Sequence, residues 1–186
     1  MFSDDMANKR IFTIPNLLSV FRLVLIPIFV WTYCVREAYL VTAGILLLSG
    51  MTDIADGFIA RRFHMVSDLG KALDPIADKL TQAAMLFCLV IRFPLMWFPL
   101  IALGMKEISG GILSLLTIRR TGIVMGADWH GKAASMFLFI MMLIHLLWFD
   151  IPKTVSVGMI SVCSAMLLLS WVLYGWRNIK LLIIKG

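Results

Sequence analysis

Five aspartates lie within one stretch of an otherwise apolar sequence, residues 50–82. Asp53 and Asp56 are three residues apart, so their side chains share one face of a helix. The same holds for Asp74 and Asp78, which are four residues apart. If a short loop joins the two helices as antiparallel neighbours, these four carboxylates converge on one pocket.

Carboxylates that face one another repel strongly unless cations or protons lie between them. Oxygen ligands favour the hard divalent cations Mg²⁺ and Mn²⁺ over zinc. Two such ions held by shared carboxylates suit chemistry at phosphate, because they neutralise the phosphate oxygens and align the attacking group. The spacing therefore predicts a metal-dependent phosphate site, and we interpret the fifth aspartate, Asp68, as a solvated or supporting residue.

The residues between the two aspartate pairs also suit a phosphate ligand. Gly57 directly follows Asp56 and lets a ligand approach the backbone closely. Arg61 offers a planar guanidinium for a phosphate, and Ala60 keeps the neighbouring face small. Gly70 relieves crowding ahead of the second aspartate pair.

Histidines and cysteines do not complete a zinc site in this stretch. The cysteines lie in apolar runs with no short spacing, and we interpret all of them as small buried side chains: Cys34, Cys88 and Cys163. His145 lies in an apolar segment and is expected to be buried and hydrogen-bonded. His64 and His130 are expected at the surface.

The elements that must position these residues are membrane helices. The 186 residues are 61% hydrophobic and 15% charged, with a mean hydropathy of +0.93, which is typical of a bilayer protein. A transmembrane helix needs about 20 apolar residues. The sequence predicts an all-α integral membrane protein with six such helices, at residues 17–35, 38–60, 73–92, 94–117, 132–149 and 154–175.

These helices form one predicted catalytic domain, residues 17–186, behind an amphipathic juxtamembrane segment, residues 1–16. Asn16 is a plausible N-cap of the first span. The polar start is unlike a secretory signal peptide, so the internal segments must direct insertion.

The basic residues predict the orientation of the helices. With both termini in the cytoplasm, 13 of the 17 basic residues lie on the cytoplasmic side, and Lys106 falls within a span. The opposite side receives only Arg36, Arg92 and Lys153. This positive-inside bias predicts a multi-pass protein of the inner or plasma membrane with the aspartates facing the cytoplasm. The net charge of +6 then suits anionic lipid headgroups and requires no nucleic-acid partner.

The aspartate stretch resembles the signature of the CDP-alcohol phosphatidyltransferase family. Eight positions match with their spacings: Asp53-x-x-Asp56-Gly57-x-x-Ala60-Arg61, eight further residues, then Gly70-x-x-x-Asp74-x-x-x-Asp78. The family has six transmembrane helices and a cytoplasm-facing site, so the resemblance extends over most of the chain. It implies transfer of a phosphatidyl group from CDP-diacylglycerol to an alcohol with release of CMP, using two Mg²⁺ or Mn²⁺ ions.

The resemblance also implies roles for individual residues. Asp53, Asp56 and Asp74 would bind one metal ion. Asp53, Asp74 and Asp78 would share the second, and Asp78 would also be the general base for the acceptor hydroxyl. The family's contacts to the donor match five residues here: Asn16, Ser19, Gly57, Arg61 and Ser67. The family is often homodimeric, which implies a second copy of this chain as a partner.

The acceptor is less well determined by the motif than the donor. The opening residues TIPNLLSVFRLVLIPIFV and the aspartate block most resemble bacterial members that use glycerol 3-phosphate. An anionic acceptor requires further cations, and the candidates are Lys132, Arg119 and Lys106. An ion pair with Glu107 is the alternative role for Lys106, and Arg119 or Arg120 can serve as a membrane anchor.

Two alternatives remain at this point. Family members that make cardiolipin share the motif and use phosphatidylglycerol as acceptor. An ion or proton transporter also places aspartates in membrane helices. That class predicts broken helices with acids near the midplane, whereas these aspartates flank a helix–loop–helix at the membrane edge.

Overall fold

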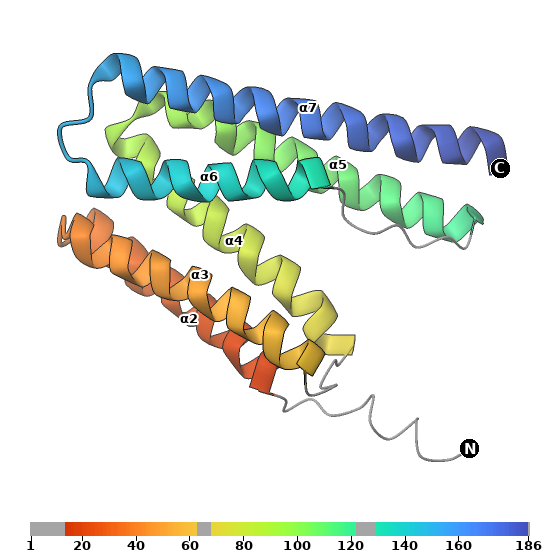
Figure 1. Cartoon of the computed structure of the whole chain (residues 1–186), viewed down its shortest axis with the longest axis horizontal. Coiled ribbons are helices and arrows are strands. Elements are labelled where there is room, and N and C mark those ends of the chain that lie inside the picture. The colour runs from red at the N-terminus through yellow and green to blue at the C-terminus, as the bar shows by residue number, and fades with distance from the viewer. Residues whose placement is uncertain (1–13, 63–67, 122–128, 186) are drawn as a thin grey trace. The chain divides into compact units, whose positions relative to one another are not determined.

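The computed structural model describes residues 14–62, 68–121 and 129–185 (Figure 1). The described residues form α-helices, one short 3₁₀ helix and no strand, which confirms the all-α fold class. The elements are, in order, α2 (Ile14–Cys34), α3 (Tyr39–Arg62), α4 (Asp68–Arg92), η1 (Pro94–Met96), α5 (Trp97–Thr121), α6 (Trp129–Leu147) and α7 (Lys153–Lys185).

Five segments are long and apolar enough to cross a membrane: Asn16–Cys34, Tyr39–Asp56, Pro94–Arg120, Trp129–Leu147 and Lys153–Leu181. The remaining long helix, α4, has 25 residues and carries Asp74 and Asp78 in its first half. At 1.5 Å per residue it is about 37 Å long, which exceeds the thickness of a hydrocarbon core. The helices therefore match the predicted integral membrane architecture.

Two helix boundaries differ from the prediction in informative ways. Helix α2 begins at Ile14, so Asn16 lies inside its first turn and is not the N-cap. Helix α7 continues to Lys185, well beyond the predicted end at residue 175. Charged residues end an apolar span, but they do not end a helix, because Lys and Arg have good helix propensity.

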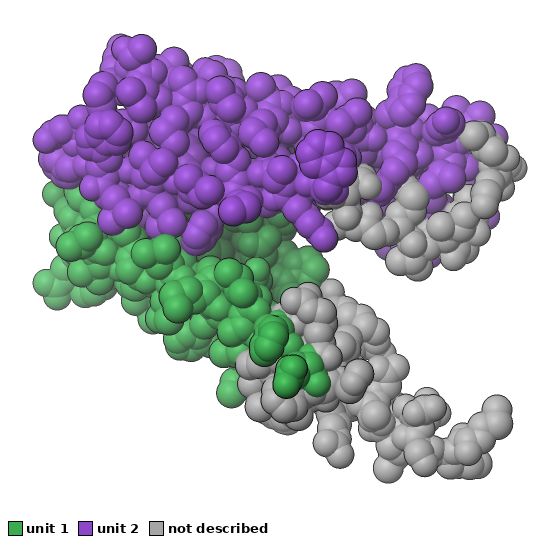
Figure 2. Space-filling model, viewed as in Figure 1, with its two compact units in different colours: residues 1–88 green, residues 89–186 purple. Residues whose placement is uncertain are grey.

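The chain divides into two compact units, residues 1–88 and 89–186 (Figure 2). In the first unit α2 and α3 pack side by side, with Leu25 and Phe29 buried on α2 and Leu46 on α3. The hydroxyls of Thr32 and Thr42 lie 2.9 Å apart across this pair. Both helices thus run from one tight connection towards the aspartate stretch.

The second unit consists mainly of α5, α6 and α7, and α7 packs against both of the others. Polar side chains link α7 to its neighbours: the Ser114 and Tyr174 hydroxyls are 2.8 Å apart, and Trp171 Nε1 donates to Ser109 Oγ at 2.6 Å. Gly110 lies against the ring of Tyr174, where an added Cβ would be 3.4 Å from the nearest ring atom. Its missing side chain lets α5 and α7 approach closely at this point.

Candidate functional site

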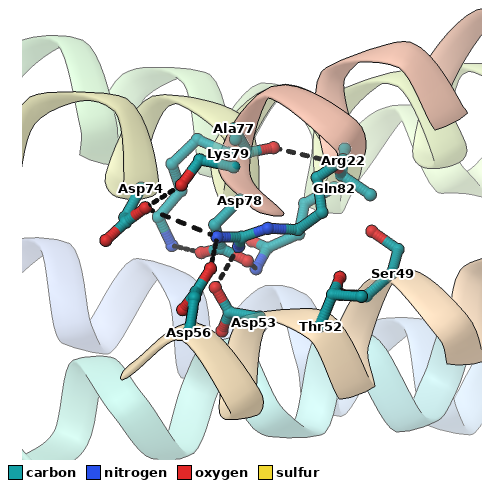
Figure 3. A network of polar contacts seen from close by, with 12 residues as sticks. Arg22, Ser49, Thr52, Asp53, Asp56, Asp74, Ala77, Asp78, Lys79 and Gln82 are labelled. Atoms are coloured by element: carbon teal, nitrogen blue, oxygen red, sulfur yellow. Dashed lines mark hydrogen bonds and ion pairs between the residues drawn. The ribbon is translucent and has the colours of Figure 1, made fainter. Parts of the chain in front are cut away.

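A buried arginine lies at the centre of the aspartate stretch (Figure 3). Arg22, on α2, forms ion pairs through Nη1 with Oδ1 of Asp53 and through Nη2 with Oδ2 of Asp56, both on α3. Its Nη2 also lies 3.6 Å from Oδ1 of Asp74, on α4. Three helices thus meet at one guanidinium group, which we call the carboxylate cluster: Arg22, Asp53, Asp56 and Asp74.

The carboxylate cluster is buried on one side and accessible on the other. The side chains of Arg22 and Asp56 are 1% and 3% exposed, whereas those of Asp53 and Asp74 are 46% and 35% exposed. A ligand can therefore reach the cluster from the side of Asp53 and Asp74.

Helix α2 contributes two more residues to the site. Ser19 Oγ donates a hydrogen bond to Oδ1 of Asp74, and both Ser19 and Asn16 are buried. Asn16, Ser19 and Arg22 follow one another at intervals of three residues, so they share one face of the helix. The predicted donor contacts Asn16 and Ser19 therefore lie on the helix face that covers the aspartates.

Asp78 lies beside the cluster but has different partners. Gln82 Nε2 donates to its Oδ1 at 2.8 Å, and Lys79 Nζ lies 3.3 Å from its Oδ2. Gln82 is buried and one helical turn from Asp78, so its amide fixes the orientation of the carboxylate. Asp53 experiences the negative charges of both Asp78 and Asp74. All four aspartates of the predicted site are thus brought together by α3 and α4.

Local sequence explains why α3 and α4 present these side chains. Thr52 Oγ1 caps back to Ser49 O at 2.7 Å, and Thr81 Oγ1 donates to Ala77 O at 2.8 Å, so both hydroxyls are satisfied within their own helices. Pro75 has no N–H and therefore removes one intrahelical hydrogen bond directly after Asp74.

The donor set fits a hard divalent cation, but the arrangement is not a ready-made coordination sphere. Asp53, Asp56 and Asp74 all lie within reach of a single cationic group, and every available ligand atom is a carboxylate oxygen. Within the described ranges no three acidic, histidine or cysteine side chains are placed to hold a metal ion together. The guanidinium of Arg22 lies between the carboxylates instead.

Several predicted donor contacts lie where the side chains are not described. Gly57 and Arg61 belong to α3, which places them on the helix that carries Asp53 and Asp56, but their side chains lie outside the described residues. Ser67 lies outside them entirely, as does His64.

The predicted acceptor residues all belong to the second unit. Lys106 and Arg119 lie on α5, and Lys132 lies on α6. Lys106 Nζ is 2.8 Å from Oε1 of Glu107, so the ion pair considered from sequence is present. Arg119 and Lys132 are exposed. Because the two units are described separately, these three residues remain predictions for the acceptor site.

The remaining histidines and cysteines follow the sequence interpretation only in part. His145 is buried, with Nδ1 2.8 Å from Met141 O and Nε2 2.9 Å from Ser156 Oγ, as expected. His130 is half-buried, and its Nδ1 lies 3.1 Å from Ser170 Oγ on α7. The interpretation of Cys34 was wrong, because it is exposed at the end of α2 with its Sγ 3.8 Å from that of buried Cys88.

Sequence reasoning missed the central role of Arg22. It was counted only among the basic residues of the cytoplasmic side, because it lies near the start of a span. Two signals point to it: an arginine between Phe21 and Leu23 in an apolar helix is costly unless it is paired, and it shares a helix face with Asn16 and Ser19.

Comparison with known proteins supports this site. A sequence model of the CDP-alcohol phosphatidyltransferase family matches residues 12–176. A CDP-diacylglycerol–glycerol-3-phosphate 3-phosphatidyltransferase of Pectobacterium atrosepticum is 31% identical over 173 residues, 90% of this chain and 94% of that protein. A cardiolipin synthase (CMP-forming) of Streptomyces coelicolor is 33% identical over 183 residues, 91% of this chain and 77% of that protein.

A third relative covers less of its own length. A protein of Mycobacterium tuberculosis, described provisionally as a cardiolipin synthase, is 38% identical over 132 residues, 70% of this chain. The aligned part spans 62% of that mycobacterial protein. Since the family match covers nearly the whole chain, including every aspartate of the cluster, the chain belongs to the CDP-alcohol phosphatidyltransferase family.

Proposed function

We propose that this protein transfers the phosphatidyl group of CDP-diacylglycerol to glycerol 3-phosphate and releases CMP. The observation that carries the proposal is the meeting of Asp53, Asp56 and Asp74 at one cationic group, beside Asp78, in a chain of this family. An array of carboxylates at the edge of a membrane helix suits a diphosphate substrate that is anchored in the bilayer by its lipid tails.

In this proposal Asp53, Asp56 and Asp74 hold one divalent ion, and Asp53, Asp74 and Asp78 hold the second. Mg²⁺ or Mn²⁺ at such a site supplies charge neutralisation for the donor's diphosphate. The half-exposed faces of Asp53 and Asp74 suit this role, because the diphosphate must approach from the accessible side.

Asp78 is the proposed general base. Its carboxylate takes the proton of the acceptor hydroxyl as the hydroxyl oxygen bonds to the β-phosphorus, and the bond from that phosphorus to the bridging oxygen breaks to release CMP. The side chain of Asp78 is 36% exposed, so an acceptor can reach it. The hydrogen bond from Gln82 leaves its second oxygen directed away from the amide, where Lys79 lies at 3.3 Å.

The donor headgroup would contact the buried polar face of α2, with Asn16 and Ser19, together with Gly57, Arg61 and Ser67. The acceptor phosphate would be bound by Lys132 and Arg119. Lys106 is the weakest of the acceptor candidates, because its ammonium group already pairs with Glu107 at 2.8 Å.

A second candidate function is cardiolipin synthesis, with phosphatidylglycerol as the acceptor. It is favoured by the names of the Streptomyces and mycobacterial relatives, which are 33% and 38% identical to this chain. Glycerol 3-phosphate remains the first choice because the Pectobacterium relative aligns over 94% of its length.

The deciding experiment supplies the purified full chain with CDP-diacylglycerol, Mg²⁺ or Mn²⁺, and either glycerol 3-phosphate or phosphatidylglycerol. Lipid products are identified by mass spectrometry, and CMP release is measured in parallel. We expect phosphatidylglycerophosphate with the first acceptor. Cardiolipin formed with the second acceptor, and no product with the first, would overturn the proposed acceptor.

The proposal extends to the setting of the enzyme. The basic residues favour an active site that faces the cytoplasm, and the family resemblance favours a homodimer. Labelling of single introduced cysteines from each side of inverted and right-side-out vesicles tests the first, and mass measurement in lipid nanodiscs tests the second.

A further inference from the structure

We propose that Arg22 is a built-in counter-cation: it holds the aspartates together before divalent ions bind, and it opposes their binding. This inference rests on the proposed function, because the competing ions are those of the proposed metal site. It assigns Arg22 a positioning role through the aspartates.

The geometry of Arg22 differs from that of an isolated ion pair. Both terminal nitrogens of its guanidinium are engaged, one with Asp53 and the other with Asp56 and Asp74. The carboxylates come from α3 and α4, while the arginine comes from α2. One side chain therefore connects the three helices of the first unit at the point where the aspartates meet (Figure 3).

The charges show why Arg22 is needed when divalent ions are absent. Three carboxylates close together in a partly buried site repel one another, and this repulsion disfavours their common ionised state. Arg22 offsets one of the three negative charges, and its side chain is 99% removed from solvent, so its attraction is weakly screened. The remaining surplus of negative charge is what a divalent cation would neutralise.

The same contacts explain why Arg22 should oppose the metal ions. Each of the three carboxylates directs one of its oxygens to the guanidinium, and an oxygen that accepts a charged hydrogen bond is a poorer metal ligand. A fixed positive charge beside the site also repels any incoming cation. Divalent ions must therefore take over carboxylate oxygens that Arg22 holds.

The remaining guanidinium nitrogen indicates that the aspartates determine the position of Arg22. Among the described residues its Nε is buried and has no hydrogen-bond partner. A buried donor without a partner is unfavourable, so the ion pairs with the aspartates must outweigh this cost. Loss of some of those ion pairs to metal ions should leave the arginine less firmly held.

The test measures Mn²⁺ binding to the full-length protein in lipid nanodiscs, from the loss of the free-ion EPR signal, without substrate. We compare the wild type with R22Q, which removes the charge, and R22K, which keeps the charge but loses the two-nitrogen fork. R36Q is the matched control, since Arg36 is an exposed cation at the other end of α2 that stacks over Trp31. We expect R22Q to bind Mn²⁺ at least about tenfold more tightly, R22K to lie between, and R36Q to match the wild type.

A second readout follows thermal unfolding of the same proteins in chelator, through tryptophan fluorescence. R22Q should unfold at a lower temperature than R36Q and the wild type, because its aspartates have lost their counter-cation. Added Mn²⁺ should raise the Tm of R22Q more than that of the wild type. If R22Q does not fold without metal, R22K gives the same comparison with a smaller expected shift.

The outcomes separate the inference from the proposed function. Saturable Mn²⁺ binding of equal or lower affinity in R22Q and R22K would overturn the role of Arg22 and leave the metal site intact. An unchanged Tm of both variants in chelator would overturn it as well. If neither the wild type nor any variant binds Mn²⁺, the metal site itself is wrong, and the inference falls with it.

Discussion

At the scale of single residues, the four aspartates of this site fall into two environments. Asp53, Asp56 and Asp74 share Arg22, whereas Asp78 is held by Gln82 and lies beside Lys79. The aspartate without a contact to the buried arginine is thus the one proposed to take up a proton. A carboxylate that is less strongly neutralised by cations is the better base.

The residue-scale prediction concerns Asp78. Asn at this position keeps the size of the side chain but accepts no proton, so Asp78→Asn should lower CMP release by at least about 100-fold. The measurement is CMP formation with glycerol 3-phosphate in saturating Mn²⁺, alongside Tm to establish folding. Asp150→Asn, an exposed change in the connection between α6 and α7, is the control. Undiminished CMP release by the folded Asp78→Asn protein would exclude Asp78 as the base.

At the scale of elements, the packing of α2 on α3 and α4 is what assembles the site. The three helices approach one another at both ends: Ser19 and Arg22 contact Asp74 near one end, and Cys34 lies beside Cys88 near the other. Contacts between α2 and α4 at both ends keep the polar face of α2 directed at the aspartates. The same packing makes two predictions about helix pairs.

The first element-scale prediction is a cross-link between α2 and α4. The Sγ atoms of Cys34 and Cys88 are 3.8 Å apart, so small side-chain rotations bring them to disulfide distance. Treatment with a mild thiol oxidant should yield a Cys34–Cys88 linked peptide by mass spectrometry, reversed by reductant and absent from Cys88→Ser. Buried Cys163 should stay reduced. Recovery of all three thiols after oxidation would mean that α2 and α4 are not in contact at this end.

The second concerns the contact of α5 with α7. A side chain at position 110 would meet the ring of Tyr174, whereas at position 111 nothing lies within 4 Å of an added Cβ. Gly110→Leu should therefore destabilise the protein by about 1–3 kcal/mol through overpacking, while Gly111→Leu should have little effect. Thermal unfolding in nanodiscs distinguishes the two. Equal Tm values for both variants would contradict this packing.

At the scale of the whole molecule, an apolar exterior surrounds a small number of polar groups. Many large apolar side chains point outward along the helices, among them Leu40, Ile54, Phe87, Ile112 and Val172. Their exposure is expected for a protein whose surroundings are lipid tails. A membrane-embedded enzyme of this kind can bind a lipid-linked donor directly from the bilayer.

The whole-molecule prediction is dependence on divalent ions. Chelation of Mg²⁺ and Mn²⁺ should abolish phosphatidyl transfer, because the carboxylates then repel the donor's diphosphate. Activity should return when either ion is added back, whereas Ca²⁺ tests tolerance of a larger ion. The measurement is lipid product formed per unit time in nanodiscs. Transfer that persists in excess chelator would refute the metal-dependent mechanism.

The helices and the aspartate pairs could be predicted from the sequence for a simple physical reason. Long apolar runs must be helical in a bilayer, since every backbone polar group needs an internal partner. Residues three or four apart must then share a face, which placed Asp53 with Asp56 and Asp74 with Asp78. The boundaries at Ile14 and Lys185 were missed, because hydropathy reports where a span ends and not where a helix ends.

Tertiary structure alone decided which cation faces the aspartates and which thiols meet. Arg22 is 31 residues from Asp53 and 34 from Asp56 in sequence, and Cys34 is 54 residues from Cys88. Helix periodicity relates residues within one helix, but it carries no information about the rotation of one helix against another. That rotation is determined by packing between helices, and here it brings a buried arginine of α2 to the aspartates of α3 and α4.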